Sequence, residues 1–284
     1  MINAFNDADH MQMAIDFMKW WYLPDTQQQY LTRGGMPCDK ATPASADGRG
    51  RHLDRSGDRP YLQALEREHE EGKSAMTDMV LWGFNGSTYV RTVKMLLAEK
   101  RFTDFEQVPT NVLAGEPKEP EHLARHPFGK VPVLDHDGMR ILETSAIVRY
   151  LNDVLPGQSL VPATPKDRAR MDMIIGLIDS YGYGALIGGV AAYHLFPDFV
   201  GGKNEDMRAR GLKDGRTMLE LAMQTRAGSP FIAGDLSLAD LYLAPTAFYV
   251  SLTPDKDQLF GVDGFAAWWD AVQALDCFKS TPPQ

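Results

Sequence analysis

The sequence predicts an α+β protein of two domains, because the pattern of apolar residues changes once along the chain. Between residues 79 and 151, short β-rich runs accompany two stretches in which apolar residues recur at helical spacing. Beyond Leu151 no strand pattern recurs. The expected organisation is an N-terminal extension over residues 1–78, an α+β domain over 79–155, a linker over 156–164 and an all-helical domain over 165–284.

The α+β domain is predicted to begin with a β-α-β unit. Residues 80–84 form a β-rich run, residues 85–88 form a polar turn with a helix start signal, and residues 102–108 form a second run. Three apolar residues between the runs recur at helical spacing: Val90, Val93 and Leu97. Such a unit pairs its two strands in parallel through a right-handed crossover.

A β-hairpin and a second helix are predicted to follow, after a helix-poor segment over residues 109–126. Asp137-Gly138 separates two short apolar runs and is a strong hairpin signal, because glycine accepts a positive φ without steric cost. A helical pattern begins at Glu143 and Thr144. The order β-α-β and then β-β-α is that of a thioredoxin-like domain. The predicted fold is therefore a thioredoxin-like domain followed by an all-helical domain.

Pro132 is expected to have a structural role at the start or the edge of a strand, since proline cannot donate to a sheet ladder. Its peptide bond with Val131 has two possible forms. A cis bond would turn the N–H and C=O of Val131 outward, where they can pair with an extended ligand backbone. A trans proline in an ordinary edge strand is the alternative.

The helix start at Glu143 and Thr144 is a candidate binding site. A helix N-terminus has unpaired N–H groups and a positive dipole end, so it attracts a carboxylate, to which Thr144 can add a hydroxyl. Glu143 can accept an ammonium group. The pair therefore suits the terminus of an α-amino acid. The alternative is that Thr144 or Ser145 merely caps the helix.

In the helical domain, Ser237 and Asp240 have the spacing of a capping box, with Ser237 at the N-cap and Asp240 reaching back from the third helical position. We predict that both residues are structural and that Asp240 is not catalytic. Pro245 is expected to kink this helix. Four glycines between residues 182 and 189 are expected to weaken or bend the preceding long helix.

Composition excludes several classes of function. The net charge is −9 and basic residues do not alternate with aromatic ones, which argues against nucleic acid as a partner. No apolar run approaches the ~18 residues that span a bilayer, and a secretory signal is lacking, so neither membrane nor export is expected. Cys38 and Cys277 lie far apart, which indicates a reducing cytoplasm. The histidines at 122, 126 and 136 lack ligand spacing, so we predict no metal.

The first 75 or so residues differ from the rest. Residues 31–60 are polar and interrupted by glycine and proline, so they cannot bury enough surface to offset the entropy of ordering. We expect the extension to be largely disordered. Met76 and Met79 lie just before the first strand, so translation starting there, with an upstream start-site artefact, is one hypothesis. A genuine tail is the other, and detection of upstream peptides by mass spectrometry would establish it.

From Val80 to the C-terminus the chain resembles the cytosolic glutathione S-transferase family, and it is most similar to the phi class and related bacterial enzymes. Four segments in the family's order carry the resemblance: GFNGSTYVRTV (83–93), AGEPKEPEHLARHPFGKVPVL (114–134), LETSAIVRYL (142–151) and DLSLADLYLAP (235–245). The resemblance does not extend to the N-terminal region.

The resemblance implies that Ser87 is the catalytic serine. A hydroxyl aimed at sulfur and the N-terminal end of a helix both favour a thiolate, which is scarce at neutral pH for a free thiol of pKa about 8.5. Capping without chemistry is the alternative for Ser87, and Thr88 and Tyr89 are runner-up donors. The resemblance also implies that Val131 pairs its backbone with the cysteinyl unit of glutathione, and that Glu143 and Thr144 hold the γ-glutamyl end.

Two lysines are implied at the glycyl end of glutathione, each with a departure from the family pattern. Lys118 matches the lysine that holds the glycyl carboxylate, although Pro117 replaces the usual preceding histidine. Lys130 stands where phi relatives usually have glutamine. Lys118 as a solvated surface residue is the alternative.

The expected function is that of a glutathione transferase that uses glutathione as co-substrate and attacks small hydrophobic electrophiles. One alternative is a glutathione-dependent dehalogenase, lyase, isomerase or peroxidase on the same site. Another is a non-catalytic glutathione-fold binding protein. The electrophile pocket is expected between the domains, with Tyr181, Tyr183 and Tyr193 as candidate lining residues. The resemblance alone implies a homodimer.

Overall fold

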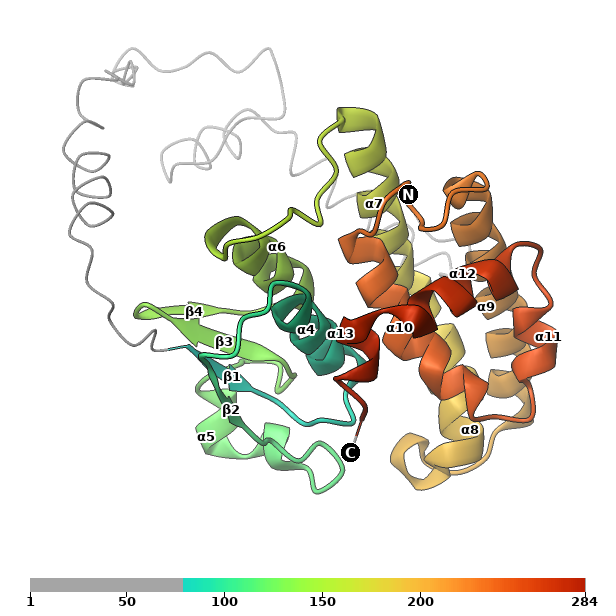
Figure 1. The fold of residues 1–284 in the computed structure, drawn as a ribbon. Coiled ribbons are helices and arrows are strands. Elements are labelled where there is room, and N and C mark those ends of the chain that lie inside the picture. The colour runs from blue at the N-terminus through green and yellow to red at the C-terminus, as the bar shows by residue number, and fades with distance from the viewer. Residues whose placement is uncertain (1–78, 284) are drawn as a thin grey trace, which may run out of the picture. The chain divides into compact units, whose positions relative to one another are not determined.

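In the computed structural model, which describes residues 79–283, a small mixed sheet with flanking helices precedes a bundle of helices (Figure 1). This is the predicted α+β arrangement. The predictions for residues 1–78, including disorder and the start-site hypothesis, lie outside the described residues.

The first domain is a β-α-β unit joined by a loop to a β-hairpin and a helix. Its elements are β1 (Val80–Trp82), α4 (Thr88–Glu99), β2 (Glu106–Val108), the 3-10 turn η1 (Glu116–Lys118), α5 (Pro120–Leu123), β3 (Val133–His136), β4 (Met139–Ile141) and α6 (Thr144–Val154). β1 and β2 are shorter than the runs of residues 80–84 and 102–108 that predict them, and the segment expected to be helix-poor contains η1 and α5.

The four strands lie in the order β2-β1-β3-β4. β1 and β2 pair in parallel, as the β-α-β pattern predicts, and the other two pairs are antiparallel. Leu81 and Leu134 pair at the centre of the sheet and are fully buried. Asp137 and Gly138 both have positive φ, 50° and 73°, in the turn between β3 and β4. This is the geometry that a two-residue hairpin turn requires.

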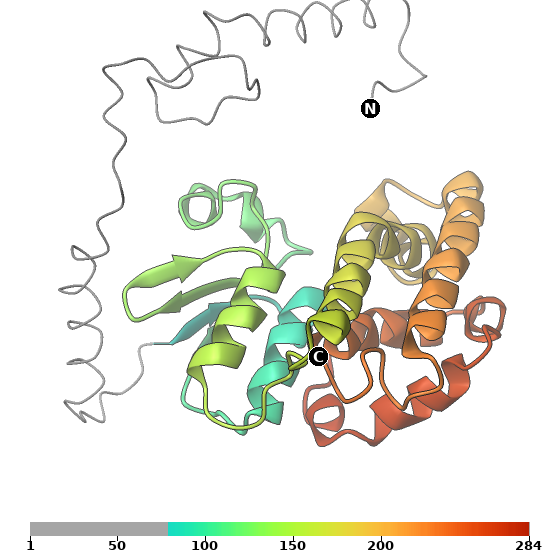
Figure 2. The same ribbon diagram turned by 90° about the horizontal axis from the view of Figure 1, so that it is seen from above.

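Helix α4 connects the two domains. Its buried residues include Val90, Val93, Met95 and Leu96 and lie on more than one side of the helix, because α4 packs against α6 in its own domain and α10 in the next. Figure 2 shows α4 and α6 together on one face of the sheet, with α5 on the opposite face. The N-terminus of α4 consequently lies where the two domains meet.

The second domain is helical, and isolated β-bridges near residue 233 are its only extended pairing among the described residues. Its elements are α7 (Pro165–Leu177), the π-helical segments η2 (Ile178–Gly182) and η3 (Gly184–Ala191), α8 (Ala192–Leu195), the 3-10 turn η4 (Pro197–Val200), α9 (Glu205–Arg226), α10 (Leu238–Ser251), α11 (Lys256–Phe260), α12 (Phe265–Ala274) and α13 (Asp276–Lys279).

Residues 165–195 form one long helical stretch whose middle is π-helical. The glycines expected to weaken this helix lie in or beside its wider turns. The stretch of 31 residues is also long and apolar enough to cross a membrane by length and composition, contrary to the expectation from the sequence. It packs against α9 and α10 in this domain, and core helices meet the same criterion.

Helices η3 and α9 cross closely because glycines face each other at the crossing. A Cβ atom added to Gly211 would lie 2.6 Å from the carbonyl oxygen of Ala185 and 3.0 Å from Cα of Gly189. No flexible side chain is available to yield there, since both contacts are with backbone.

Replacing Gly211 with alanine is therefore expected to destabilise the fold by about 1–3 kcal/mol, as overpacking does in well-packed cores. Gly176→Ala is the matched control, because its added Cβ meets nothing within 4 Å and alanine is the better helix former. Urea unfolding followed by circular dichroism measures both. A Gly211→Ala variant as stable as the control would contradict the close crossing.

Asp240 anchors the start of α10. It is fully buried and accepts hydrogen bonds from the Ser237 N–H (3.0 Å), the Ser237 hydroxyl (2.9 Å), the Ile232 N–H (2.9 Å) and the Trp268 Nε1–H (2.9 Å). The capping box is present, and α10 continues through Pro245 to Ser251. Asp240 thereby connects α10, α12 and the loop before α10.

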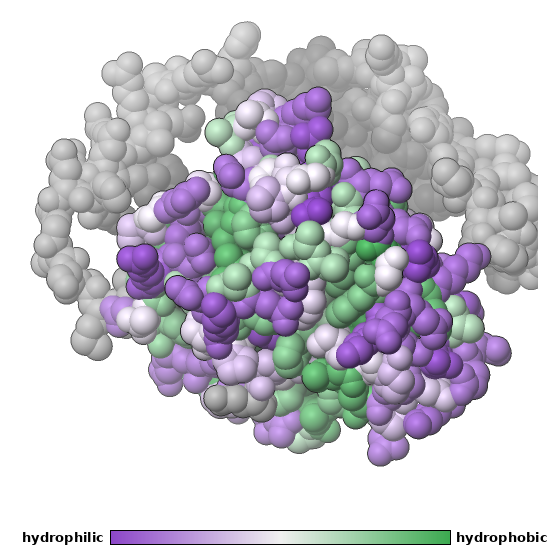
Figure 3. Space-filling model, turned by 45° about the vertical axis from the view of Figure 1, so that its right-hand side comes forward, coloured by the Kyte–Doolittle hydropathy of each residue, from purple (hydrophilic) through white to green (hydrophobic). Residues whose placement is uncertain are grey.

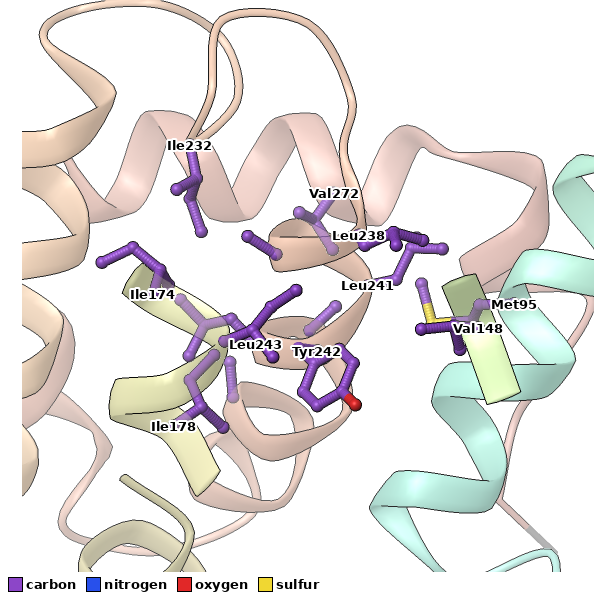
Figure 4. Close-up of a cluster of buried hydrophobic side chains, with 14 of the residues drawn as sticks. Met95, Val148, Ile174, Ile178, Ile232, Leu238, Leu241, Tyr242, Leu243 and Val272 are labelled. Carbon is purple, nitrogen blue, oxygen red and sulfur yellow. The ribbon is translucent and has the colours of Figure 1, made fainter. Parts of the chain in front are cut away.

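The core of the second domain surrounds α10. Figure 4 shows Leu243 of α10 beside Ile174 and Ile178 of the long helical stretch. Met95 and Val148, from the first domain, lie on the side of Leu241 and Tyr242. One apolar core therefore continues from the first domain into the second. On the face shown in Figure 3, hydrophobic surface lies in separate areas between hydrophilic residues.

Candidate active site

Two cavities meet in the cleft beside the N-terminus of α4. Cavity A has a volume of about 430 Å³ and cavity B about 530 Å³. Both are lined by Tyr89, Lys130 and Val131. The other lining residues of cavity A are His126, Phe128, Pro132, Glu143, Thr144 and Asp179. Those of cavity B include Ser87, Thr88, Lys118 and a group of apolar and aromatic side chains.

The start of α6 forms one end of cavity A. Glu143 is the N-cap residue and has a φ of +68°, which is unusual for a residue other than glycine and costs backbone energy. No side chain caps the helix. The simple capping role for Thr144 or Ser145 is therefore absent. Among residues 79–283, the first N–H groups of α6 have no hydrogen-bond partner, and they lie beside the buried Thr144.

Asp179 lies on the same cavity but comes from the other domain, in η2. It accepts a hydrogen bond from the Tyr89 hydroxyl at 2.9 Å. Burial raises the pKa of Asp179, and the negative charge of Glu143 raises that pKa further. The sequence analysis did not identify Asp179, because a lone aspartate on a helix carries no motif.

Val131 lies where the cavities join, just before β3. The Val131-Pro132 peptide bond is cis, so the trans alternative does not hold. Among the described residues, neither the N–H nor the C=O of Val131 takes part in an intramolecular hydrogen bond. Val131 therefore offers one backbone donor and one backbone acceptor to an extended ligand.

Ser87 is the N-cap of α4 and lines cavity B. Its Oγ accepts a hydrogen bond from the Val90 N–H at 3.4 Å. Capping uses an oxygen lone pair, whereas donation uses the hydroxyl hydrogen, so the two roles are compatible. The runner-up donors are differently placed, since Tyr89 donates to Asp179 and the hydroxyl oxygen of Thr88 is buried.

The two lysines line cavity B and are exposed. Lys118 is exposed, but its ammonium group donates to the carbonyl oxygen of Phe128 at 2.9 Å. The ammonium group of Lys130, which borders both cavities, has no intramolecular partner among residues 79–283. Pro117, the departure from the family pattern, is buried and also lines cavity B.

His126 is a further residue of cavity A that the sequence analysis did not select. It is only 2% exposed, and its Nδ1 accepts a hydrogen bond from the Phe128 N–H at 3.2 Å. Burial lowers the pKa of His126, so the ring is neutral at neutral pH. Within the described part of the chain, His126 belongs to no group of three or more side chains able to hold a metal ion.

Most of cavity B is apolar. Its aromatic side chains come from both domains: Phe84, Tyr89, Tyr183, Phe196, Phe199 and Tyr249. The rings of Tyr89 and Tyr183 stack with centroids 4.9 Å apart. Tyr181 and Tyr193, the other two tyrosines expected here, do not line either cavity. The cavity is therefore suited to a flat apolar molecule.

Comparison with known proteins identifies the family. Residues 77–153 match the family model described as the glutathione S-transferase N-terminal domain. Glutathione S-transferase F14 of Arabidopsis thaliana is 31% identical over 209 residues, which cover 71% of this chain and 79% of that protein. The chain belongs to the glutathione S-transferase family. The predicted resemblance is thus confirmed.

Other similar proteins include an isomerase and solved transferase structures. A maleylacetoacetate isomerase of Rhizobium meliloti is 32% identical over 174 residues, covering 59% of this chain and 78% of that protein. Among solved structures, glutathione transferase F7 from Populus trichocarpa superposes with a TM-score of 0.64 at 25% identity, covering 72% of this chain and 97% of that chain. The glutathione S-transferase fold, with its thioredoxin-like and helical domains, is therefore established for residues 79–283.

Proposed function

We propose that the protein conjugates glutathione to small hydrophobic electrophiles, with Ser87 activating the thiol. One observation carries this proposal. Ser87 and the unpaired backbone of Val131 line cavity B. At Val131 this cavity adjoins cavity A, which is lined by the start of α6. A tripeptide thiol that fills cavity A and passes Val131 would present its sulfur to the side of cavity B on which Ser87 lies.

Each part of glutathione has a complementary group. The free N–H groups of α6 and the Thr144 hydroxyl suit the α-carboxylate of the γ-glutamyl unit, and Glu143 suits its ammonium group. The Val131 backbone suits the cysteinyl unit. Lys118 and Lys130 suit the glycyl carboxylate. This assignment leaves the apolar part of cavity B for the electrophile.

The chemistry requires a thiolate. The Ser87 hydroxyl and the N-terminal end of α4 stabilise negative charge on sulfur, so the thiol loses its proton to solvent more readily. The sulfur lone pair then forms a bond to an electrophilic carbon. With an aryl halide, the carbon–halogen electron pair leaves with the halide ion. The enzyme also holds both reactants close together.

The lining of cavity B favours conjugation over the isomerase activity that the maleylacetoacetate isomerase relatives suggest. Its charged residues are Lys118 and Lys130, both assigned to glutathione, while aromatic, aliphatic and small residues form most of the rest. A non-catalytic binding protein would have the same cavities, so activity must decide between them. A homodimer and a cytoplasmic location are proposals that rest on the family.

Glu143→Ala tests the glutathione site directly. A charge-assisted hydrogen bond to the ammonium group contributes about 1.5–3 kcal/mol, so we expect the KM for glutathione to rise at least about tenfold. Retention on immobilised glutathione should be lost. The rate of conjugation to an aryl halide at saturating glutathione should change little, because Glu143 lines cavity A whereas Ser87 lines cavity B.

Glu119→Ala is the control for this test, since Glu119 is exposed in the same domain and its side chain makes no capping bond. It should behave like the unmodified protein. A Glu143→Ala variant that still binds immobilised glutathione would show that the ligand does not use the start of α6. A wild-type protein that binds glutathione without turning over any electrophile would favour the binding-protein alternative.

A further inference from the structure

We infer that Tyr249, near the end of α10 in the helical domain, fixes the loop that leads to Ser87 and thereby positions the Ser87 hydroxyl. This inference rests on the proposed function, in which Ser87 activates the thiol, and it adds a residue of the other domain to that step. The observation that carries it is a hydrogen bond from the Tyr249 hydroxyl to the carbonyl oxygen of Gly86, 2.5 Å long. The two residues are 163 positions apart in the chain.

The accepting oxygen belongs to the peptide group that immediately precedes the Cα atom of Ser87. A peptide group is planar, so the carbonyl oxygen of Gly86 and the N–H of Ser87 turn together. Tyr249 holds the oxygen of this plane, and the N–H on its other side donates to the carbonyl oxygen of Phe84 at 3.0 Å. Two bonds on opposite sides of the plane oppose its rotation. They therefore fix the direction in which the Ser87 side chain leaves the backbone.

The first domain holds the same loop one residue earlier, at Asn85. Its Oδ1 accepts hydrogen bonds from Nζ of Lys94 at 2.8 Å and from Nε2 of Gln107 at 2.9 Å. Within the described part of the chain, no group of the first domain donates to the carbonyl oxygen of Gly86. Tyr249 therefore holds a point of the loop that the first domain leaves without a partner.

Tyr249 is itself held rigidly. It is 8% exposed, and its ring meets those of Phe196 and Phe248 edge to face, with centroids 5.6 Å apart in both pairs. The guanidinium group of Arg91, on α4, lies over the ring of Phe248 at 4.7 Å from its centroid. Helix α10 also packs against α4. The helical domain therefore presents a fixed donor to the loop, because both the ring and the helix that carries it are packed.

The bond to Gly86 determines which role is open to Tyr249. A phenol has one hydrogen to donate, and this hydrogen is already used, although the ring of Tyr249 lines cavity B. None is left for the sulfur or the electrophile. Burial raises the pKa of Tyr249, so the hydroxyl keeps its proton over the pH range in which the thiol ionises. Tyr249 therefore acts through Ser87 and not on the reacting atoms.

The experiment is a double-mutant cycle of Tyr249→Phe and Ser87→Ala in the full-length protein, assayed by conjugation of glutathione to an aryl halide. Phenylalanine keeps the ring in the wall of cavity B and removes only the hydroxyl. Tyr150→Phe is the matched control, because it removes a hydroxyl that bonds to His136 at 2.8 Å and lines neither cavity. Thermal unfolding followed by circular dichroism is measured for every variant.

We expect Tyr249→Phe to lower kcat about five- to tenfold at neutral pH, since a slightly misplaced activating group loses much of its effect. The KM values for glutathione and for the aryl halide should change little. The loss should shrink as the pH rises, because a misplaced hydroxyl leaves the bound thiol with a higher pKa. In the Ser87→Ala background the same substitution should cost less than about twofold, and Tyr150→Phe should match the wild type.

An equal loss with and without the Ser87 hydroxyl would show that Tyr249 acts independently of Ser87 and would overturn the inference. Full activity of Tyr249→Phe would overturn it as well. A loss that is constant with pH, or that Tyr150→Phe shares, would assign to Tyr249 a general contribution to stability instead of a positioning role. If Ser87→Ala is as active as the wild type, or the wild type conjugates no aryl halide, the proposed function itself fails.

Discussion

Replacement of Ser87 by alanine is expected to lower kcat/KM for conjugation of an aryl halide about 100-fold at neutral pH. Ser87 is the hydroxyl on the wall of cavity B at the N-terminus of α4. Its removal should raise the pKa of the bound thiol by about two units, and each unit lowers the thiolate fraction about tenfold below the pKa. The KM for glutathione should change much less, since Ser87 is not on cavity A.

The dependence of this loss on pH identifies its cause. Below the thiol pKa values of both proteins, the ratio of wild-type to variant rates should be at its largest. As the pH rises above about 8.5, the ordinary value for a free thiol, both bound thiols become ionised and the ratio should approach one. Stopped-flow or steady-state assays from pH 6 to pH 9.5 measure this profile.

Two further variants separate activation from capping. Ser87→Gly removes the hydroxyl at a cost of only a few tenths of a kcal/mol as an N-cap, so it should lose activity as the alanine variant does. Thr88→Val removes the neighbouring hydroxyl, which is buried, and should retain most of the activity. A loss of the same size in Thr88→Val, or a loss in Ser87→Ala that does not vary with pH, would contradict the role of Ser87.

The elements of the first domain were predictable because local signals agree with the fold. Asp137-Gly138 is the favoured turn for a two-residue hairpin, and both residues have the required positive φ. The start of α6 at Thr144 follows from the apolar spacing after it. Strand lengths were not predictable in the same way, since a strand ends where its partner ends. β1 therefore stops at Trp82, although the apolar run continues to Phe84.

The parts of the site that come from the helical domain were harder to predict. Asp179 is 36 residues after Glu143 in the chain, and the two line one cavity only because η2 packs beside the first domain. The π-helical turns contain more residues per turn than an α-helix. A prediction that assumes 3.6 residues per turn therefore places side chains beyond Leu177 on the wrong face of the helix. Tyr183 rather than Tyr181 or Tyr193 consequently lines cavity B.

Replacement of Asp240 by alanine is expected to destabilise the protein by about 3–5 kcal/mol, because several buried donors would lose their acceptor together. These donors are the N–H groups of Ile232 and Ser237, the Ser237 hydroxyl and the Trp268 indole. Burial raises the pKa of Asp240, and the four hydrogen bonds oppose that rise. Urea unfolding at one fixed protein concentration measures the loss, with circular dichroism as the signal.

Asp235→Asn is the control for Asp240, since Asp235 is exposed in the same loop and its replacement should change the stability by less than about 0.5 kcal/mol. Asp240→Asn should also be destabilising, because its amide nitrogen would bring a donor into a site already surrounded by donors. Any remaining folded Asp240→Asn protein should bind glutathione with the wild-type affinity, as Asp240 lines neither cavity. A stable variant with lost activity would instead assign Asp240 to catalysis and contradict its structural role.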